Sequence, residues 1–194
     1  MLNIVIFGPP GAGKGTQSQK LIDKYQLVHI STGDLFRAHI KKETDLGKKV
    51  IEYNNNGILV PDSITIDMLK GVLNENKQAN GFIFDGYPRT VAQAEALDKF
   101  MEENNTSIHA VVQLAVTEEE VRQRLKIRRD AEHRPDDEES KVNRRIEEYF
   151  DKTVHVLPYY EKQGKLAKIN GIGSIDDIFA KTCEQIDVAR GAKA

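Results

Sequence analysis

The feature that most constrains the fold is a glycine-rich segment near the N-terminus, Gly8-Pro9-Pro10-Gly11-Ala12-Gly13-Lys14-Gly15-Thr16. It follows a mostly apolar run, Leu2–Phe7, that is typical of a β-strand, and it precedes residues 17–25, which can form a helix. A strand, a glycine-rich turn and a helix in this order are the context that a phosphate-binding loop requires. Glycines let consecutive backbone N–H groups surround an anion, and the N-terminus of the following helix adds positive potential. The segment therefore predicts a P-loop in which Lys14 binds the phosphates of a nucleotide.

Composition excludes several other classes of protein. The chain of 194 residues is long enough for one well-packed domain, and its net charge of −2 gives no overall basic field for nucleic acid. The single cysteine, Cys183, excludes an internal disulfide and a zinc site made of several cysteines. There is no basic-then-apolar leader and no apolar run of membrane-spanning length. We therefore expect a cytoplasmic protein that binds neither nucleic acid nor membranes.

Arginines are concentrated in one region, whereas lysines are spread along the chain. The planar guanidinium binds phosphate oxygens bidentately and stays charged where water is excluded. A run of charge is usually a solvated helix face, but the P-loop elsewhere in the chain favours phosphate binding here. The arginines of this region are Arg122, Arg124, Arg128, Arg129, Arg134, Arg144 and Arg145.

Strand-like and helical segments alternate along the chain, which predicts an α/β fold with a doubly wound parallel sheet of five strands. Two or three short helices between residues 31 and 60 indicate an inserted lobe rather than one crossover helix. A polar break at 130–133 precedes a long helix whose spaced side chains are Val142, Ile146, Tyr149, Phe150 and Thr153. The expected strands are residues 2–7, 27–30, 81–85, 108–116 (the most continuous apolar run, read as a central strand) and 166–169.

An acidic residue, Asp85, ends the buried-type strand at residues 81–85. A carboxylate at this position suits the octahedral water shell of Mg²⁺ in a P-loop enzyme. The segment Gly86-Tyr87-Pro88-Arg89 follows directly, and it predicts a turn that projects Arg89 toward the crevice where parallel α/β sheets bind ligands. The five histidines show no metal-ligand spacing, so we interpret them as structural or solvated.

Together these segments resemble the adenylate kinase family, within the nucleoside monophosphate kinases, over about residues 1–185. The P-loop shares with that family the glycine between Lys14 and Thr16, and residues 85–89 resemble its signature, with Tyr87 where Phe is common. The resemblance implies the reaction Mg·ATP + AMP ⇌ 2 ADP, with ATP, AMP and ADP as the small-molecule partners and Mg²⁺ as the cofactor.

The resemblance also implies a role for individual residues. It places ATP binding at Gly11, Ala12, Gly13, Lys14, Gly15, Thr16, Arg124, Arg128 and Gly173. It places AMP binding at Thr32, Arg37, Ile58, Leu59, Val60, Gly86, Tyr87, Pro88, Arg89, Gln93, Arg134 and Arg145, with Gln93 reading the base. The catalytic cations would be Lys14, Arg89, Arg128, Arg134 and Arg145, and Asp85 would hold Mg²⁺ through water.

The resemblance further divides the chain into three parts: a core of residues 1–30, 61–128 and 135–194, an AMP-binding lobe of residues 31–60, and a short lid loop of residues 129–134. With a single cysteine we expect no structural zinc in the lid, and we expect a monomer. Two alternatives remain at this point: a UMP/CMP kinase on the same fold, and a non-enzymatic switch protein that binds ATP. Thr32 and Gln93 favour adenine over a pyrimidine, and the Gly-Tyr-Pro-Arg turn has no use in a switch protein.

Overall fold

The computed structural model describes residues 1–132 and 138–191. Its centre is a five-stranded parallel sheet in the order β2-β3-β1-β4-β5, which confirms the predicted sheet. β1 is the middle strand, and β4, which the sequence suggested as central, lies beside it in the interior of the sheet. The strands are β1 (Leu2–Phe7), β2 (Val28–Ser31), β3 (Gly81–Asp85), β4 (Ala110–Ala115) and β5 (Leu166–Asn170).

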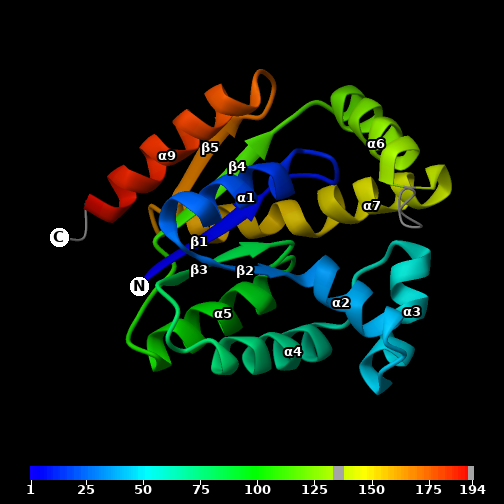
Figure 1. The fold of residues 1–194 in the computed structure, drawn as a ribbon, viewed down its shortest axis with the longest axis horizontal. Helices are drawn as coiled ribbons and strands as arrows, with labels where there is room; N and C mark the ends of the chain where they lie inside the picture. The colour runs from blue at the N-terminus through cyan, green and yellow to red at the C-terminus, as the bar shows by residue number, and fades with distance from the viewer. Residues whose placement is uncertain (133–137, 192–194) are drawn as a thin grey trace.

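Helices cover both faces of the sheet, so the fold is doubly wound (Figure 1). α1 (Lys14–Tyr25) and α9 (Ile175–Gly191) pack on one face, and α4 (Asp62–Glu75) and α5 (Val91–Glu103) pack on the other. The remaining helices are α2 (Thr32–Lys41), α3 (Asp45–Asn56), α6 (Glu118–Glu132), α7 (Glu139–Asp151), the 3₁₀ helix η2 (Thr153–Val156) and α8 (Leu157–Glu161).

The strand β1 shows why both faces must be covered. Its side chains alternate between the faces: Ile4 and Ile6 enter the core under α1 and α9, and Val5 and Phe7 enter the core under α4 and α5. All six residues of the strand are buried. A strand without a polar face is typical of the interior of a parallel sheet, and the hydrophobic effect then requires a helical layer on each side.

α2 and α3 form a helical hairpin at the end of the molecule where α6 also lies (Figure 1). Ser31 caps α2 and Thr44 caps α3, each by accepting a hydrogen bond from a backbone N–H of the first turn. Gly47 faces the backbone of α2, and a Cβ atom at this position would lie 2.2 Å from the carbonyl oxygen of His39. The hairpin is therefore closely packed because residue 47 has no side chain.

The structure corrects the predicted break at 130–133 and the predicted start of the lid loop. α6 runs through Glu132, so residues 129–132 of the expected loop are helical. The segment is polar but contains neither Gly nor Pro, and Arg, Ala and Glu are good helix formers, so polarity alone did not end the helix. His133 and Arg134, the last two residues of the interval 129–134, lie outside the described residues.

Three other features of the helices also differ from expectation. α1 begins at Lys14 rather than at residue 17, so the P-loop lysine belongs to the first turn of the helix. α7 ends at Asp151, and Phe150, expected on its apolar face, is 46% exposed. The short helices η2 and α8 were not predicted, although a proline in the first turn of α8 is a known start signal. Within residues 1–132 and 138–191, no helix combines the length and the apolar character needed to cross a membrane.

Candidate active site

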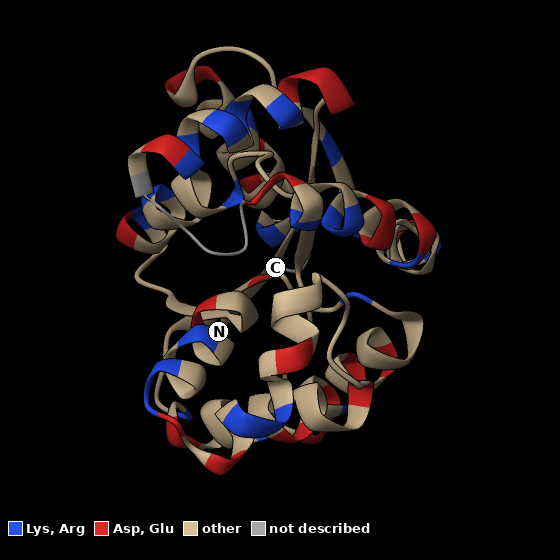
Figure 2. Ribbon diagram, turned by 90° about the vertical axis from the view of Figure 1, so that its right-hand side faces the viewer, with Lys and Arg blue, Asp and Glu red and all other residues tan. Residues whose placement is uncertain are grey.

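A cleft of about 1020 Å³ opens at the carboxyl edge of the sheet. The P-loop, the start of α2, residues 57–60, the turn after β3, and α6 all contribute to its lining. Figure 2 views the molecule from the side of α2, α3 and α6, and it shows Lys and Arg residues on the helices in the upper part of the view. The strand order reverses at β1, from β2 and β3 on one side to β4 and β5 on the other. Ligands of open α/β sheets bind at such a switch point.

The P-loop turns from β1 into α1 with two residues in left-handed backbone conformations. Gly11 has φ 79° and Gly13 has φ 93°, values that are strained for residues with a Cβ atom. Gly13 is the N-cap of α1, and no side chain caps the helix there. The first N–H groups of α1 therefore remain available as donors, and together with the helix dipole they form an anion-binding site.

The side chain of Lys14 folds back onto this loop. Its Nζ donates to the carbonyl oxygen of Gly8 at 2.9 Å and to that of Pro9 at 3.1 Å. Desolvation by burial lowers the pKa of Lys14 to about 8, and the nearby charge of Asp85 partly opposes this shift. The ammonium is thus held inside the loop by two neutral carbonyl groups, with one carboxylate nearby, an environment that a phosphate group would complete.

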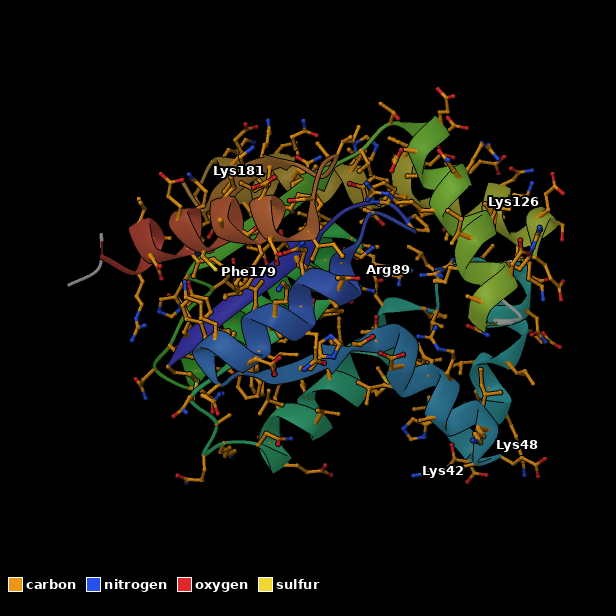
Figure 3. All side chains as sticks on the ribbon, turned by 45° about the horizontal axis from the view of Figure 1, so that its top comes forward. Lys42, Lys48, Arg89, Lys126, Phe179 and Lys181 are labelled. Carbon is orange, nitrogen blue, oxygen red and sulfur yellow. The ribbon has the colours of Figure 1, made fainter. Side chains whose placement is uncertain are left out.

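Positive charges from three other segments converge on Lys14. Arg89, Arg145 and Arg128 each lower its pKa further by electrostatic repulsion. They come from the turn after β3, from α7 and from α6, and all of them line the cleft together with Lys14. Figure 3 shows Arg89 in the middle of the molecule, between the start of α1 and the helices α2 and α6. Four cations gathered in one cleft indicate a polyanionic ligand.

Asp85 faces the same cleft from the end of β3. Burial would raise its pKa, but interaction with His29 and the positive charges of Lys14 and Arg89 hold the pKa below its usual range. His29 Nε2 lies 3.9 Å from Asp85 Oδ2. The carboxylate is therefore ionised in a half-buried position, which suits a hard cation. Among the residues that the structure describes, no three His, Cys, Asp or Glu side chains cluster as a cage around a metal ion.

The turn after β3 positions Arg89. The carbonyl oxygen of Gly86 accepts from Arg89 Nε and from Thr32 Oγ1, both at 2.8 Å. Gly86 has φ 75°, and a Cβ atom on it would lie 2.9 Å from the Arg89 guanidinium. The absence of a side chain at residue 86 therefore lets the guanidinium fold against its own turn, and the same carbonyl links the turn to the start of α2.

Gln93 lies on α5 at the inner wall of the cleft and is only 2% exposed. Its Oε1 accepts from the backbone N–H of Arg89, and its Nε2 donates to Asp62 Oδ1, both at 2.8 Å. Each of these amide atoms can form a second hydrogen bond. The side chain is therefore a fixed donor and acceptor pair at the wall of the cleft.

On the α6 side, Arg124 connects three segments. Its Nε donates to Glu120 at 2.6 Å, Nη2 to the carbonyl oxygen of Gly171 at 3.0 Å, and Nη1 to that of Ala12 at 3.3 Å. The P-loop is thereby tied to the loop after β5. Two exposed apolar side chains, Ile127 and Ile175, line the cleft nearby and could contact the flat face of a base.

The structure brings most of the predicted site residues to this one cleft. Tyr87 and Pro88 instead line an adjoining cavity of about 60 Å³, and the buried Tyr87 hydroxyl donates to the carbonyl oxygen of Gln93. Arg134 lies outside the described residues. The predicted residues that line the main cleft are Gly11, Ala12, Gly13, Lys14, Gly15, Thr16, Thr32, Arg37, Ile58, Leu59, Val60, Asp85, Gly86, Arg89, Gln93, Arg124, Arg128, Arg145 and Gly173.

Sequence reasoning missed two polar residues of this region. His29, interpreted as structural or solvated, lines the cleft beside Asp85. Its position two residues before the end of β2, next to β3, is a signal that could have placed it near the catalytic edge. Asp62, at the start of α4, received no role from the sequence, but its Oδ1 accepts a hydrogen bond from the side chain of Gln93. Asp62 and Gln93 are 31 residues apart, and no sequence pattern indicates that their side chains meet.

Comparison with known proteins identifies the family. Residues 6–165 match the family model described as adenylate kinase. Adenylate kinase of Bacteroides thetaiotaomicron is 46% identical over 187 residues, which cover 96% of this chain and 99% of that protein. Adenylate kinase of Flavobacterium psychrophilum is 45% identical over 188 residues, covering 96% and 99%. That of Maricaulis maris is 44% identical over 179 residues, covering 92% and 95%. With relatives this similar along nearly its whole length, and with a P-loop cleft lined by four converging cations, the chain belongs to the adenylate kinase family and is a nucleoside monophosphate kinase.

Proposed function

We propose that this protein catalyses Mg·ATP + AMP ⇌ 2 ADP in the cleft at the carboxyl edge of the sheet, and so balances the adenine nucleotides of the cytoplasm. The assignment of phosphate-binding residues rests on one observation. Cations from four segments converge at the P-loop: Lys14, Arg89, Arg128 and Arg145. Two nucleotides meeting end to end bring a chain of phosphates to one point, and cations from four separate segments are suited to hold it.

The ATP phosphates bind to the P-loop backbone and to Lys14, and the ATP base lies between Arg124 and the loop that contains Gly173. The short distances from Arg124 to Ala12 and Gly171 support this arrangement, because they fix the phosphate and base regions relative to each other. Exposed Ile127 and Ile175 offer apolar contact to the base. Arg128 lines the same cleft and lowers the pKa of Lys14 by electrostatic repulsion, so we assign it to the phosphates of the donor.

AMP binds on the opposite side, against α2, residues 57–60 and α5. Gln93 reads the Watson–Crick edge of the adenine, and Arg37, Arg89 and Arg145 bind the phosphate. Residues Ile58, Leu59 and Val60 line the cleft where the base would lie. We assign Arg134 to the transferring phosphoryl group on its match to the family alone. Tyr87 and Pro88 support this side from beneath, since the Tyr87 hydroxyl holds the backbone of Gln93.

Asp85 is the protein group that would hold Mg²⁺, through water. An ionised, half-buried carboxylate beside the P-loop fits a cation that keeps most of its water and binds substrate phosphates rather than an all-protein cage. When bound, Mg²⁺ neutralises charge on the phosphate oxygens.

The chemistry needs no general base, because the attacking oxygen of AMP is already ionised at neutral pH. The residues therefore act by positioning the two phosphates and by stabilising the charge of the transition state. Water must be excluded, or ATP would be hydrolysed. We assign this task to closure of the 31–60 lobe and the 129–134 lid over the core of residues 1–30, 61–128 and 135–194, in a protein that acts as a monomer.

Phosphorus NMR tests the reaction directly. Protein, Mg²⁺ and ATP are mixed with AMP, CMP, UMP or no acceptor, and ADP resonances are expected only with AMP. ADP production that is faster with CMP or UMP would identify a pyrimidine nucleotide kinase, and the absence of any transfer would identify a protein that only binds ATP.

Binding of ATP should depend on pH through Lys14. The pKa of this lysine is about 8 in the free protein, and a bound polyphosphate raises it, so binding above pH 8 must take up a proton. The dissociation constant for Mg·ATP should therefore rise with pH above 8, approaching about tenfold per pH unit, and be flat below pH 7.5. Isothermal titration calorimetry from pH 7.5 to 9.5 measures this slope. Lys14→Arg should remove it, because arginine stays charged throughout this range; an identical slope in that variant would assign the proton to another group.

A further inference from the structure

The inference concerns Asp62, which joins two donors that are distant in sequence. Its Oδ1 accepts from Gln93 Nε2 at 2.8 Å, and its Oδ2 accepts from Thr90 Oγ1 at 2.9 Å. The Thr90 hydroxyl oxygen in turn accepts from the backbone N–H of Gln93 at 3.2 Å, so its hydrogen is free to point to Asp62. Asp62 itself does not line the cleft. Of its two side-chain partners, Gln93 lines the cleft and Thr90 does not, so Gln93 connects Asp62 to a bound substrate.

Two donors reach different oxygens of residue 62, and a carboxylate presents an acceptor to each of them. This fixes the direction of the Gln93 amide. If the amide turned over, its oxygen would face the carboxylate of Asp62 and its NH₂ group would face the N–H of Arg89. Both hydrogen bonds would be replaced by contacts between like groups. Asp62 and the backbone N–H of Arg89 together fix the orientation of the Gln93 amide, with Oε1 toward Arg89 and Nε2 toward Asp62.

The orientation of the Gln93 amide determines which base it can recognise. Gln93 keeps one lone pair on Oε1 and one hydrogen on Nε2 for a ligand. Adenine presents a complementary pair, the N6 amino donor and the N1 acceptor, whereas hypoxanthine presents an O6 acceptor and an N1–H donor in the same places. An amide locked in one direction can match one of these edges and must oppose the other.

We propose that Asp62 is a positioning residue that makes the acceptor site selective for adenine over 6-oxopurines by preventing rotation of the Gln93 amide. The inference rests on the proposed role of Gln93 as the residue that reads the base. AMP and IMP are the appropriate pair of substrates, because they differ only at the two groups that Gln93 would contact.

Asp62→Asn is the decisive variant because it is nearly isosteric. Asn has one oxygen for the two donors, so it cannot accept from Thr90 and Gln93 with separate oxygens as Asp62 does; when that oxygen faces Thr90, the Asn NH₂ group faces Gln93 and favours the reversed amide. We expect the ratio of kcat/KM for AMP to that for IMP to fall by about ten- to a hundredfold, the factor that one hydrogen bond to a charged group supplies. Asp62→Ala, where water can donate or accept, should lower the ratio in the same direction. A change in stability alone would affect both substrates equally and leave the ratio unchanged.

Asp67→Asn is the matched control, since Asp67 lies on the same helix, α4, but is exposed and does not line the cleft. It should leave the ratio within about threefold of the wild-type value. Gln93→Ala, measured in parallel, tests the role of Gln93 as the base reader separately from the role of Asp62. A ratio that falls with Gln93→Ala but not with either Asp62 variant would overturn the role of Asp62 and keep Gln93 as the base reader. A ratio that Gln93→Ala leaves unchanged would refute both assignments.

Discussion

Replacing Lys14 with methionine is expected to lower kcat for ADP formation by about 10²–10³-fold, the loss that follows removal of one preorganised donor to a transition state. Methionine keeps much of the length and apolar volume of the side chain but removes the charge. Among the described residues, the lysine donates to the carbonyl oxygens of Gly8 and Pro9, and burial partly desolvates it, so its loss should not unfold the loop. Steady-state assays at saturating ATP and AMP measure the effect.

Lys126→Met is the control for this experiment. Lys126 is exposed on α6, one residue from cleft-lining Ile127, and Figure 3 shows it on the outer side of that helix. The same chemical change there should leave kcat within about twofold. A decrease of less than about tenfold with Lys14→Met would show that the P-loop backbone and the arginines stabilise the phosphoryl group without the lysine.

The second large effect is expected from Gly47→Ala. The new methyl group would lie 2.2 Å from the carbonyl oxygen of His39, so α2 and α3 must separate to accommodate it. Backbone atoms cannot move aside as a flexible side chain can, and we expect a loss of about 3 kcal/mol in the free energy of unfolding. For a chain of this size that corresponds to a decrease in Tm of roughly 6–12 °C, measured by calorimetry. The KM for AMP should rise as well, because this hairpin carries Thr32 and Arg37.

Gly71→Ala is the matched control, since it makes the same change inside another helix, α4. A Cβ atom at residue 71 meets no other atom within 4 Å. Alanine should therefore stabilise the protein slightly, by up to about 1 kcal/mol, through its higher helix propensity. If Gly47→Ala behaved like Gly71→Ala, the close packing of the hairpin would have no energetic importance.

Several parts of the fold and the site could be predicted because their signals are local. A strand that is buried on both faces is largely apolar, so β1 and β3 were located correctly although β1 contains the buried Asn3 and β3 ends at Asp85. The P-loop needs glycines at fixed places between a strand and a helix, and that pattern is complete in the sequence. α3 ends at Asn56 and is followed by Gly57 in a left-handed conformation, so a glycine directly after a helix is another signal of this local kind.

Other features could not be predicted because they depend on neighbours that are distant in the chain. His29 looked like one of several unremarkable histidines until the pairing of β2 with β3 brought it to Asp85. Periodicity indicated that Phe150 belongs to the apolar face of its helix, but the packing of α7 leaves it exposed.

The sequence by itself determined the parallel sheet, the P-loop and the kinds of side chain that bind phosphate, because these follow from backbone conformation and local hydrophobicity. Only the tertiary structure decided which charges share one cleft and which way an amide points. Asp62 and Gln93 are 31 residues apart, and their hydrogen bond exists because α4 and α5 pack side by side on the sheet. Hydrogen bonds act over about 3 Å of space whatever the separation along the chain, so the folded arrangement alone decides which donors and acceptors meet.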